Sequence, residues 1–219
     1  MRVILLGPPA SGKGTQAQFL KEHFDLPTVS TGELIREEIR RQSEIGRATQ
    51  AGIEAGAFLA DDLVREMIAA RLAQLPDGFV LDGFPRTLPQ AEALEGLLEE
   101  SGQPLDHVFH LDVEEEVLLD RVLHRVGCPG CGRSFSEKKN PIAEGGPCPR
   151  PGCGGRLLRR KDDTRETLER RLGEYREKTR PLIGFYRERG LLRVLAGARE
   201  ADEVFAQLRE VLAAASETA

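Results

Sequence analysis

The first fifteen residues constrain the fold of this chain more strongly than any other stretch. A continuous apolar run at residues 3–6 breaks at the turn Gly7-Pro-Pro-Ala-Ser-Gly-Lys-Gly-Thr15, and residues 16–24 then carry apolar side chains at helical spacing. We therefore expect a strand, a loop and a helix. Backbone N–H groups in such a loop, together with the positive end of the following helix, bind phosphate oxygens. Lys13 has the spacing that lets a lysine reach the terminal phosphates.

One position departs from the standard phosphate-loop pattern. Gly14 stands where that motif has Ser or Thr, and the hydroxyl of Thr15 follows it. An ordinary strand-to-helix turn that happens to be rich in glycine is the alternative. The lysine spacing and the apolar strand before the turn favour a phosphate loop over that alternative.

Strands and helices alternate along the rest of the chain, which predicts an α/β fold with a parallel sheet covered by helices on both faces. Expected strands span 26–30, 107–112 and 191–195, and a further buried strand begins at Phe79 and ends in the polar, glycine-containing residues up to Arg86. Expected helices span 34–39, 61–75, 89–100, 114–126, 163–180 and 201–213. Ser30 and Glu33 have the spacing of a capping box, and Pro181 should kink or restart the long helix. Residues 42–60 contain three glycines among short helical pieces, which indicates a mobile excursion.

Length and charge limit the class of protein. A chain of 219 residues fits one domain with at most a small insertion. A formal charge of -5 and an isoelectric point near 5.6 argue against a general nucleic-acid or membrane-surface role. We expect neither a membrane span nor a cleavable signal, because no apolar stretch is long enough for either. We therefore expect a cytoplasmic protein.

All four cysteines lie in one short region, as Cys128-Pro-Gly-Cys131 and Cys148-Pro-Arg-Pro-Gly-Cys153. Two close pairs of thiolates suit tetrahedral zinc, and an all-cysteine shell indicates a structural rather than a catalytic metal. A disulfide pair or free thiols are the alternatives, and a catalytic thiol is a weaker one because nothing marks one cysteine as activated. The four histidines have no ligand spacing, and we interpret them as structural.

Charged residues near the expected strand ends are candidates for chemistry. Asp82 and Arg86 follow a buried strand, and ligands of open parallel sheets bind beyond such ends. Asp82 could hold a hydrated magnesium ion, or it could simply cap a turn. Phosphoryl transfer requires charge neutralisation and in-line placement, which arginine forks supply. Six arginines are placed for this role, although each could instead lie on a solvated face. They are Arg36, Arg86, Arg121, Arg125, Arg160 and Arg171.

Over nearly its whole length the chain resembles the adenylate kinase family. The motifs that carry the resemblance are Gly7 to Gln16, Ser30-Thr-Gly32 with Arg36, Asp82-Gly-Phe-Pro-Arg-Thr-Leu-Pro-Gln90, Arg121 with Arg125, Arg160-Lys-Asp-Asp163, Arg171 and Pro181-Leu-Ile-Gly-Phe-Tyr186. The resemblance implies a P-loop NTPase-type CORE (1–29, 60–125 and 164–219), a helical AMP-binding segment (30–59) and a LID (126–163) that bears structural zinc. It also implies a monomer that reversibly converts Mg-ATP and AMP into two ADP by direct in-line transfer while both mobile parts close.

The resemblance also assigns roles to individual residues. Catalytic charge would come from Lys13, Arg86, Arg121, Arg125, Arg160 and Arg171. ATP would contact Ala10, Ser11, Gly12, Lys13, Gly14, Thr15, Arg125, Ser134, Phe135 and Arg199. AMP would contact Thr31, Arg36, Ala57, Phe58, Leu59, Gly83, Phe84, Pro85, Arg86, Gln90, Arg160 and Arg171. Asp82 would orient magnesium-bound waters, and the zinc ligands would be Cys128, Cys131, Cys148 and Cys153.

Three features depart from the family pattern. Ala10 replaces a usual glycine, which should be harmless if its φ is negative. His124 and Val126 flank Arg125 where the family commonly has Gly and a second Arg, which removes one LID charge. The second cysteine pair has four intervening residues instead of two, which changes the geometry of the loop more than the ligands.

Two rival functions stay open. A kinase for UMP and CMP, or a relative that uses GTP, would share the fold. Gln90 favours AMP, because relatives that phosphorylate pyrimidine nucleotides are similar to this chain but have asparagines in that stretch. A non-catalytic zinc ribbon that binds nucleic acid is the second rival. Its contacts would come from Arg133, Lys138, Lys139, Arg150 and Arg156. Those cations could equally balance the four thiolates, and the acidic net charge disfavours this rival.

Overall fold

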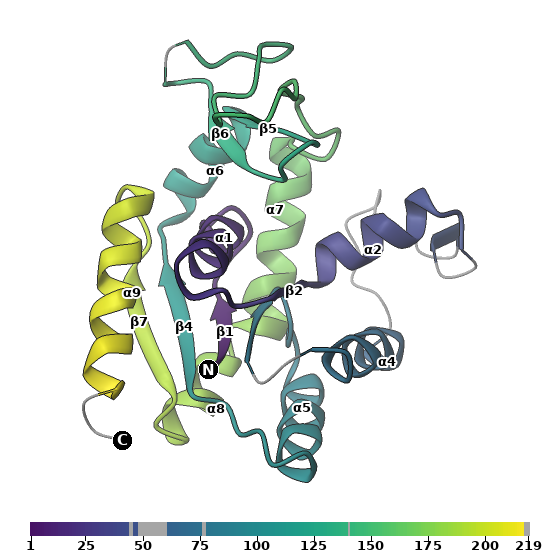
Figure 1. Cartoon of the computed structure of the whole chain (residues 1–219), viewed down its shortest axis with the longest axis vertical. Helices are drawn as coiled ribbons and strands as arrows, with labels where there is room; N and C mark the ends of the chain where they lie inside the picture. The colour runs from purple at the N-terminus through teal and green to yellow at the C-terminus, as the bar shows by residue number, and fades with distance from the viewer. Residues whose placement is uncertain (44–45, 48–60, 76–77, 140, 217–219) are drawn as a thin grey trace.

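The core of the protein is a parallel sheet of five strands in the order β2-β3-β1-β4-β7 (Figure 1). We describe it from a computed structural model, which covers residues 1–43, 46–47, 61–75, 78–139 and 141–216. The strands are β1 (Arg2–Leu6), β2 (Thr28–Ser30), β3 (Phe79–Asp82), β4 (His107–Asp112) and β7 (Leu192–Ala196). All four strand pairs run parallel, so the predicted sheet type is confirmed.

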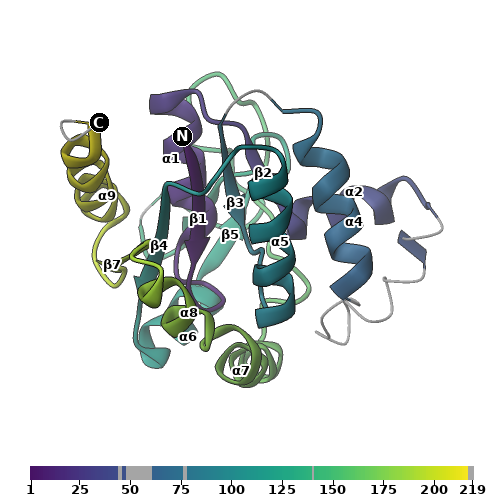
Figure 2. The same cartoon turned by 90° about the horizontal axis from the view of Figure 1, so that it is seen from below.

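Helices cover both faces of this sheet (Figure 2). They are α1 (Lys13–Phe24), α2 (Thr31–Arg40), α4 (Asp61–Leu72), α5 (Leu88–Glu100), α6 (Glu115–Leu123), α7 (Arg165–Glu174), α8 (Leu182–Glu188) and α9 (Ala201–Ser216). Alternate residues of β1 face opposite ways: Ile4 packs with side chains of α4, α5 and α8, whereas Leu5 packs with α1 and α9. Because both faces are buried, the strand reads as an unbroken apolar run.

Helix starts agree with the sequence except in one hydrogen bond. Thr87 caps α5 by accepting from the N–H of Gln90, and Thr164 caps α7 by accepting from the N–H of Thr167. Ser30 does precede α2, but its side chain makes no capping hydrogen bond. The predicted capping residue therefore lies at the start of the helix, but the predicted hydrogen bond of its side chain is not formed.

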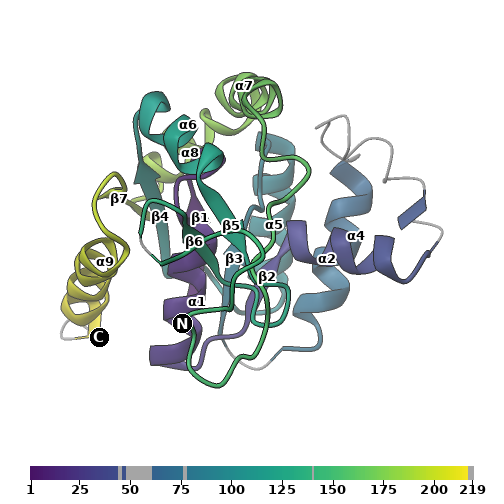
Figure 3. The same cartoon turned by 90° about the horizontal axis from the view of Figure 1, so that it is seen from above.

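The expected helix through residue 126 is also wrong at its end. Helix α6 stops at Leu123, and Arg125 instead begins β5 (Arg125–Gly127), which pairs antiparallel with β6 (Ser134–Ser136). Val126 is fully buried against Cys128 and Leu157, so packing in this small cluster overrides the helical pattern. Arg121 and Arg125 consequently do not share a helix face. Figure 3 shows β5 and β6 lying over α1 and the central strands.

The long helix near the C-terminus contains a π-turn that the sequence pattern does not predict. After α7 the chain forms a π-helix, η1 (Tyr175–Thr179), in which the N–H of Arg180 bonds to the carbonyl of Tyr175 at 2.8 Å. Helix α8 restarts directly after Pro181, as expected from the missing N–H of proline.

Most of the expected excursion at 42–60 lies outside the described residues, so the division into CORE, AMP-binding segment and LID stays a prediction. Within the part of the chain that the structure describes, no helix combines the length and the apolarity needed to cross a lipid bilayer.

Candidate functional site

The phosphate loop lies between β1 and α1, at the carboxyl end of the central strand. Gly12 adopts a left-handed conformation with φ of 104°, which an L side chain rarely tolerates, and α1 begins at the next residue. The Lys13 ammonium donates to the carbonyls of Gly7 and Pro8, at 2.8 Å each. Burial lowers the pKa of Lys13 to about 8; Asp82 opposes this shift, whereas Arg86 and Arg125 add to it.

Ala10 does not meet the condition under which its methyl group is harmless. Its φ is +64°, in the left-handed region where a Cβ approaches the following carbonyl oxygen. The loop therefore carries backbone strain at this alanine that a glycine would not have.

Asp82 ends β3, the strand next to β1. A Cβ placed on Gly14 would lie 3.6 Å from Oδ2 of Asp82, so the carboxylate faces the first turn of α1. Among the described residues, Asp82 has no hydrogen-bond or ion-pair partner for its oxygens. A carboxylate beside a phosphate loop suits a hydrated magnesium ion, which prefers oxygen ligands and keeps several of its waters.

A second group of residues follows β3. Gly83 has φ of 80°, and a Cβ there would lie 3.0 Å from the hydroxyl oxygen of Thr31, so a larger residue would be both strained and crowded. Arg86 Nε donates to the carbonyl of Gly83 at 2.7 Å, and Thr31 Oγ1 donates to the same carbonyl at 2.9 Å. Gln90 Oε1 accepts from the backbone N–H of Arg86 at 2.7 Å. The predicted acceptor residues Thr31, Gly83, Arg86 and Gln90 therefore lie together.

Burial lowers the pKa of the Arg86 guanidinium; Asp82 opposes this shift, and the positive charge of Arg171 adds to it. Since an arginine stays protonated in proteins, the shift reports a desolvated cation close to another cation. A desolvated guanidinium near a second positive charge favours binding of an anion such as phosphate.

Arg121 joins two loops at the same end of the sheet. Its Nη1 donates to the carbonyl of Ser11 at 3.1 Å, and its Nη2 donates to the carbonyl of Gly197 at 2.8 Å and to that of Arg199 at 3.3 Å. The predicted ATP residue Arg199 is thereby tied to the phosphate loop.

Two of the remaining arginines, Arg125 and Arg171, are held by two neighbouring aspartates. Arg125 forms a two-pronged ion pair with Asp163, and Arg171 Nη2 lies 2.7 Å from Asp162 Oδ2. Burial lowers the pKa of Arg160, and the charges of Arg125 and Arg36 lower it further. Both aspartates belong to the motif Arg160-Lys-Asp-Asp163, which by itself predicts no role for them. Their signal was two consecutive carboxylates directly after Arg160 and a lysine.

The other residues that we predicted to contact nucleotides differ in how exposed they are. Ser134 is exposed on β6, whereas Phe135 is partly buried against the small cluster of Val126, Cys128 and Leu157. Phe84 is 1% exposed, so only its backbone can face a ligand. Ala57, Phe58 and Leu59 lie outside the described residues.

The four cysteines come together within residues 128–153, and none forms a disulfide. Their sulfur atoms all lie within 4.8 Å of one another, with Cys128 and Cys153 3.5 Å apart and Cys131 and Cys148 3.7 Å apart. Zinc–sulfur bonds of about 2.3 Å in a tetrahedron separate the sulfurs by about 3.8 Å. The four side chains thus have the spacing of a closed zinc site.

Basic side chains around this cluster are used within the protein. Four of the five cations that the nucleic-acid alternative requires form ion pairs with residues of α1, α6 and the loop before α9. These pairs are Arg133–Glu22, Arg150–Glu22, Lys138–Asp120 and Lys139–Glu200. The fifth, Arg156, donates to the carbonyl of Gly145 at 3.1 Å. These pairs connect residues 133–150 to α1, α6 and the loop before α9, and they disfavour a free nucleic-acid surface there.

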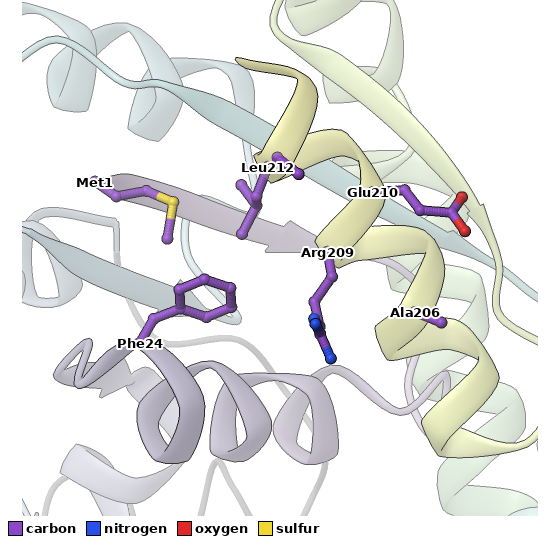
Figure 4. A pocket seen from close by; sticks show the side chains of 7 residues that line it. Met1, Phe24, Ala206, Arg209, Glu210 and Leu212 are labelled. Carbon is purple, nitrogen blue, oxygen red and sulfur yellow. The ribbon is translucent and has the colours of Figure 1, made fainter. Parts of the chain in front are cut away.

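A hollow of about 600 Å³ lies elsewhere, between the end of α1 and α9 (Figure 4). Met1, Phe24 and Leu212 form apolar walls, while Glu210 points away from them. No residue that we assign to nucleotide binding lines this hollow, so we attribute no part of the phosphate chemistry to it.

Comparison with known proteins gives a consistent result. The family model described as adenylate kinase matches residues 5–191. An adenylate kinase of Methanosarcina acetivorans is 42% identical over 215 residues, covering 97% of this chain and 99% of the relative. Adenylate kinases of Novosphingobium aromaticivorans and Symbiobacterium thermophilum are 41% and 42% identical, and each alignment covers 98% of this chain and at least 99% of the relative.

Proposed function

The chain belongs to the adenylate kinase family, and on that premise we propose that it transfers the terminal phosphoryl group of Mg-ATP directly to AMP, giving two ADP. An AMP phosphate oxygen would attack the γ-phosphorus while the bond to the β-phosphate oxygen breaks on the opposite side. No covalent intermediate with the protein is needed.

The observation that carries this proposal is the clustering of cations around the phosphate loop. In addition to burial, the positive charges of Arg86 and Arg125 lower the pKa of Lys13, and the charge of Arg171 lowers the pKa of Arg86. These side chains come from four separate elements, and among them Asp82 supplies the carboxylate. Fixed positive charge in a desolvated site is what the spread negative charge of a transferring phosphoryl group requires.

Donor and acceptor would lie on different parts of this cluster. We propose that residues 10–15 and Arg125 hold the ATP phosphates, with Ser134, Phe135 and the backbone of Arg199 near the adenine. Thr31, Arg36, Gly83, Arg86 and Gln90 would hold AMP, and Arg160 and Arg171 would reach the transferring group from the side. The ion pairs of the LID with α1 and α6 support closure over the donor, which would keep water from competing with AMP.

Two metals belong to the proposal. Magnesium, held near Asp82 through water, would supply charge neutralisation of the ATP phosphates. Zinc would be bound by the four cysteines and would hold the LID in shape, because its own apolar core is small. We further propose that the protein acts as a cytoplasmic monomer, which cell fractionation and light scattering test.

The deciding experiment measures ADP formed from Mg-ATP with AMP, UMP, CMP or GMP offered separately as acceptor. We expect fast turnover with AMP alone. Preference for a pyrimidine nucleotide would overturn the substrate assignment and keep the fold and the arginine roles. No turnover with any acceptor, combined with salt-sensitive binding to DNA or RNA, would overturn the enzyme assignment.

A further inference from the structure

The π-turn η1 lies beside Arg86, the arginine that we assign to AMP. π-Turns are rare and are often found at functional sites, because they widen a helix locally to redirect a side chain. The turn follows α7, which carries Arg171, and it ends at Thr179. Neither Tyr175 nor Thr179 has a role in the nucleotide contacts proposed above.

Thr179 contacts the backbone of Arg86. Its side-chain oxygen donates to the Arg86 carbonyl at 2.9 Å, and the residue is only 7% exposed. The N–H of Arg86 is bonded to Gln90 Oε1, so the peptide groups on both sides of the arginine Cα are fixed. Nε of the same residue is bonded to the Gly83 carbonyl. The direction in which the guanidinium leaves the backbone is therefore set by contacts that involve Thr179.

The first residue of the turn is anchored to the sheet. The hydroxyl of Tyr175 lies 3.0 Å from Nε2 of His110, which is 6% exposed on β4. His110 stands opposite Leu6 in the sheet register, and Leu6 is the last residue before the phosphate loop. The turn thus connects the strands that carry the phosphate loop to the backbone of Arg86.

We propose that Thr179 is a positioning residue for the acceptor nucleotide: it fixes the Arg86 backbone, and the Tyr175–His110 bond holds the turn from which it does so. This inference rests on the proposed function, since it assigns Arg86 to the phosphate of AMP. Removing the Thr179 hydroxyl leaves a buried carbonyl without its donor and loosens the arginine. The donor nucleotide, which relies on the phosphate loop and Arg125, should not sense the change.

The test compares Thr179→Val, which keeps the shape of the side chain, with Thr179→Ser, which keeps the hydroxyl. We expect Thr179→Val to raise KM for AMP about fivefold, the size of one ordinary hydrogen bond, with KM for ATP unchanged. Thr179→Ser should restore most of the AMP affinity. The matched control is Thr28→Val, because Thr28 Oγ1 also donates to a backbone carbonyl, but to that of Ala17 and not to that of Arg86.

The possible results distinguish a failure of the positioning role of Thr179 from a failure of the proposed kinase activity. Wild-type protein that does not phosphorylate AMP contradicts the proposed function itself. An active wild type whose Thr179→Val variant changes both KM values equally, or matches Thr179→Ser, overturns the positioning role and leaves a structural one. The Tyr175→Phe variant is a second test, which stays informative even if Thr179→Val does not fold. A selective rise in KM for AMP supports the inference, and a uniform change or no change overturns it.

Discussion

Asp163 accepts hydrogen bonds from two nitrogens of Arg125, and its side chain is 1% exposed. Arg125 begins β5, and Asp163 immediately precedes the cap of α7. The pair therefore joins the two ends of the segment 126–163, which we predict to form the LID. It also fixes a cation that we assign to the ATP phosphates.

We predict that Asp163→Asn destabilises the protein by about 3 kcal/mol, because it leaves the Arg125 charge largely buried without its partner. Urea unfolding measures this loss. Asp162→Asn is the matched control: its pair with Arg171 is about one-third exposed, so water screens it and the loss should stay below about 1 kcal/mol. Equal losses in the two variants would contradict a special role for the buried pair.

Ala10 provides a prediction of opposite sign. Its φ of +64° costs an L-residue about 1–2 kcal/mol, whereas a glycine there loses only about 0.5–1 kcal/mol more chain entropy on folding. Ala10→Gly should therefore stabilise the protein by about 0.5–1 kcal/mol in chemical denaturation. Ala17→Gly, inside α1 and buried, should destabilise it by about 1 kcal/mol or more. A loss of stability in Ala10→Gly would show that the alanine is not strained.

Much of the fold followed from local sequence signals. The apolar run of β1 and the break at Pro181 each depend on neighbouring residues, and each is confirmed. The end of α6 could not be predicted from neighbouring residues. Arg125 and Val126 continue a helical pattern, and only their pairing with β6, which is distant in the sequence by about ten residues, makes them a strand.

The site shows the same division between local and tertiary information. Lys13 and the four cysteines were predictable because their chemistry depends on short spacings that the sequence displays directly. The partners that hold the arginines were not predictable from spacing. Asp163 lies 38 residues from Arg125, and Thr179 lies 93 residues from Arg86. The left-handed φ of Ala10 likewise depends on the closure of the whole loop.

The lowered pKa of Lys13 predicts a pH dependence. Protonated Lys13 is the form that binds phosphate, so kcat/KM for ATP should fall as pH rises above about 8. Bound triphosphate favours the ammonium, so the corresponding decrease in kcat should lie at higher pH. Pre-steady-state and steady-state profiles at fixed ionic strength measure both. Lys21→Gln, which changes an exposed lysine of α1, should leave both profiles unaltered.

The same shift affects stability with a definite sign. The folded pKa of about 8 lies below the ordinary value of 10.5, so the folded protein binds fewer protons than the unfolded chain between these pH values. Lys13 therefore lowers stability below pH 8, and this penalty disappears as pH rises towards 10.5. A Lys13→Met variant should lack this component of the pH dependence, and an identical pH dependence in that variant would contradict the assignment.

Zinc removal should affect the LID before the CORE. The described LID residues bury only Val126, Cys128 and Leu157 as a core, which is too little apolar surface to hold a fold of this length without a metal. Chelation, or Cys128→Ser, should therefore let amide hydrogens at residues 126–163 exchange at a lower temperature than those of the central sheet. Unchanged melting and activity after complete zinc removal would exclude a structural metal.

Two glycines beside the cysteines give a sharper comparison for the same site. A Cβ on Gly155 would lie 2.6 Å from Sγ of Cys128, which forces that sulfur to move, whereas a Cβ on Gly130 would lie 3.5 Å from Sγ of Cys153, an ordinary contact. Gly155→Ala should therefore lose zinc to a competing chelator at least tenfold more readily than wild type, the size of effect that displaced metal-site geometry produces. Gly130→Ala should retain zinc. If both variants bind zinc equally well, the four sulfurs do not form the metal site, because a shifted ligand cannot leave the affinity of a tetrahedral shell unchanged.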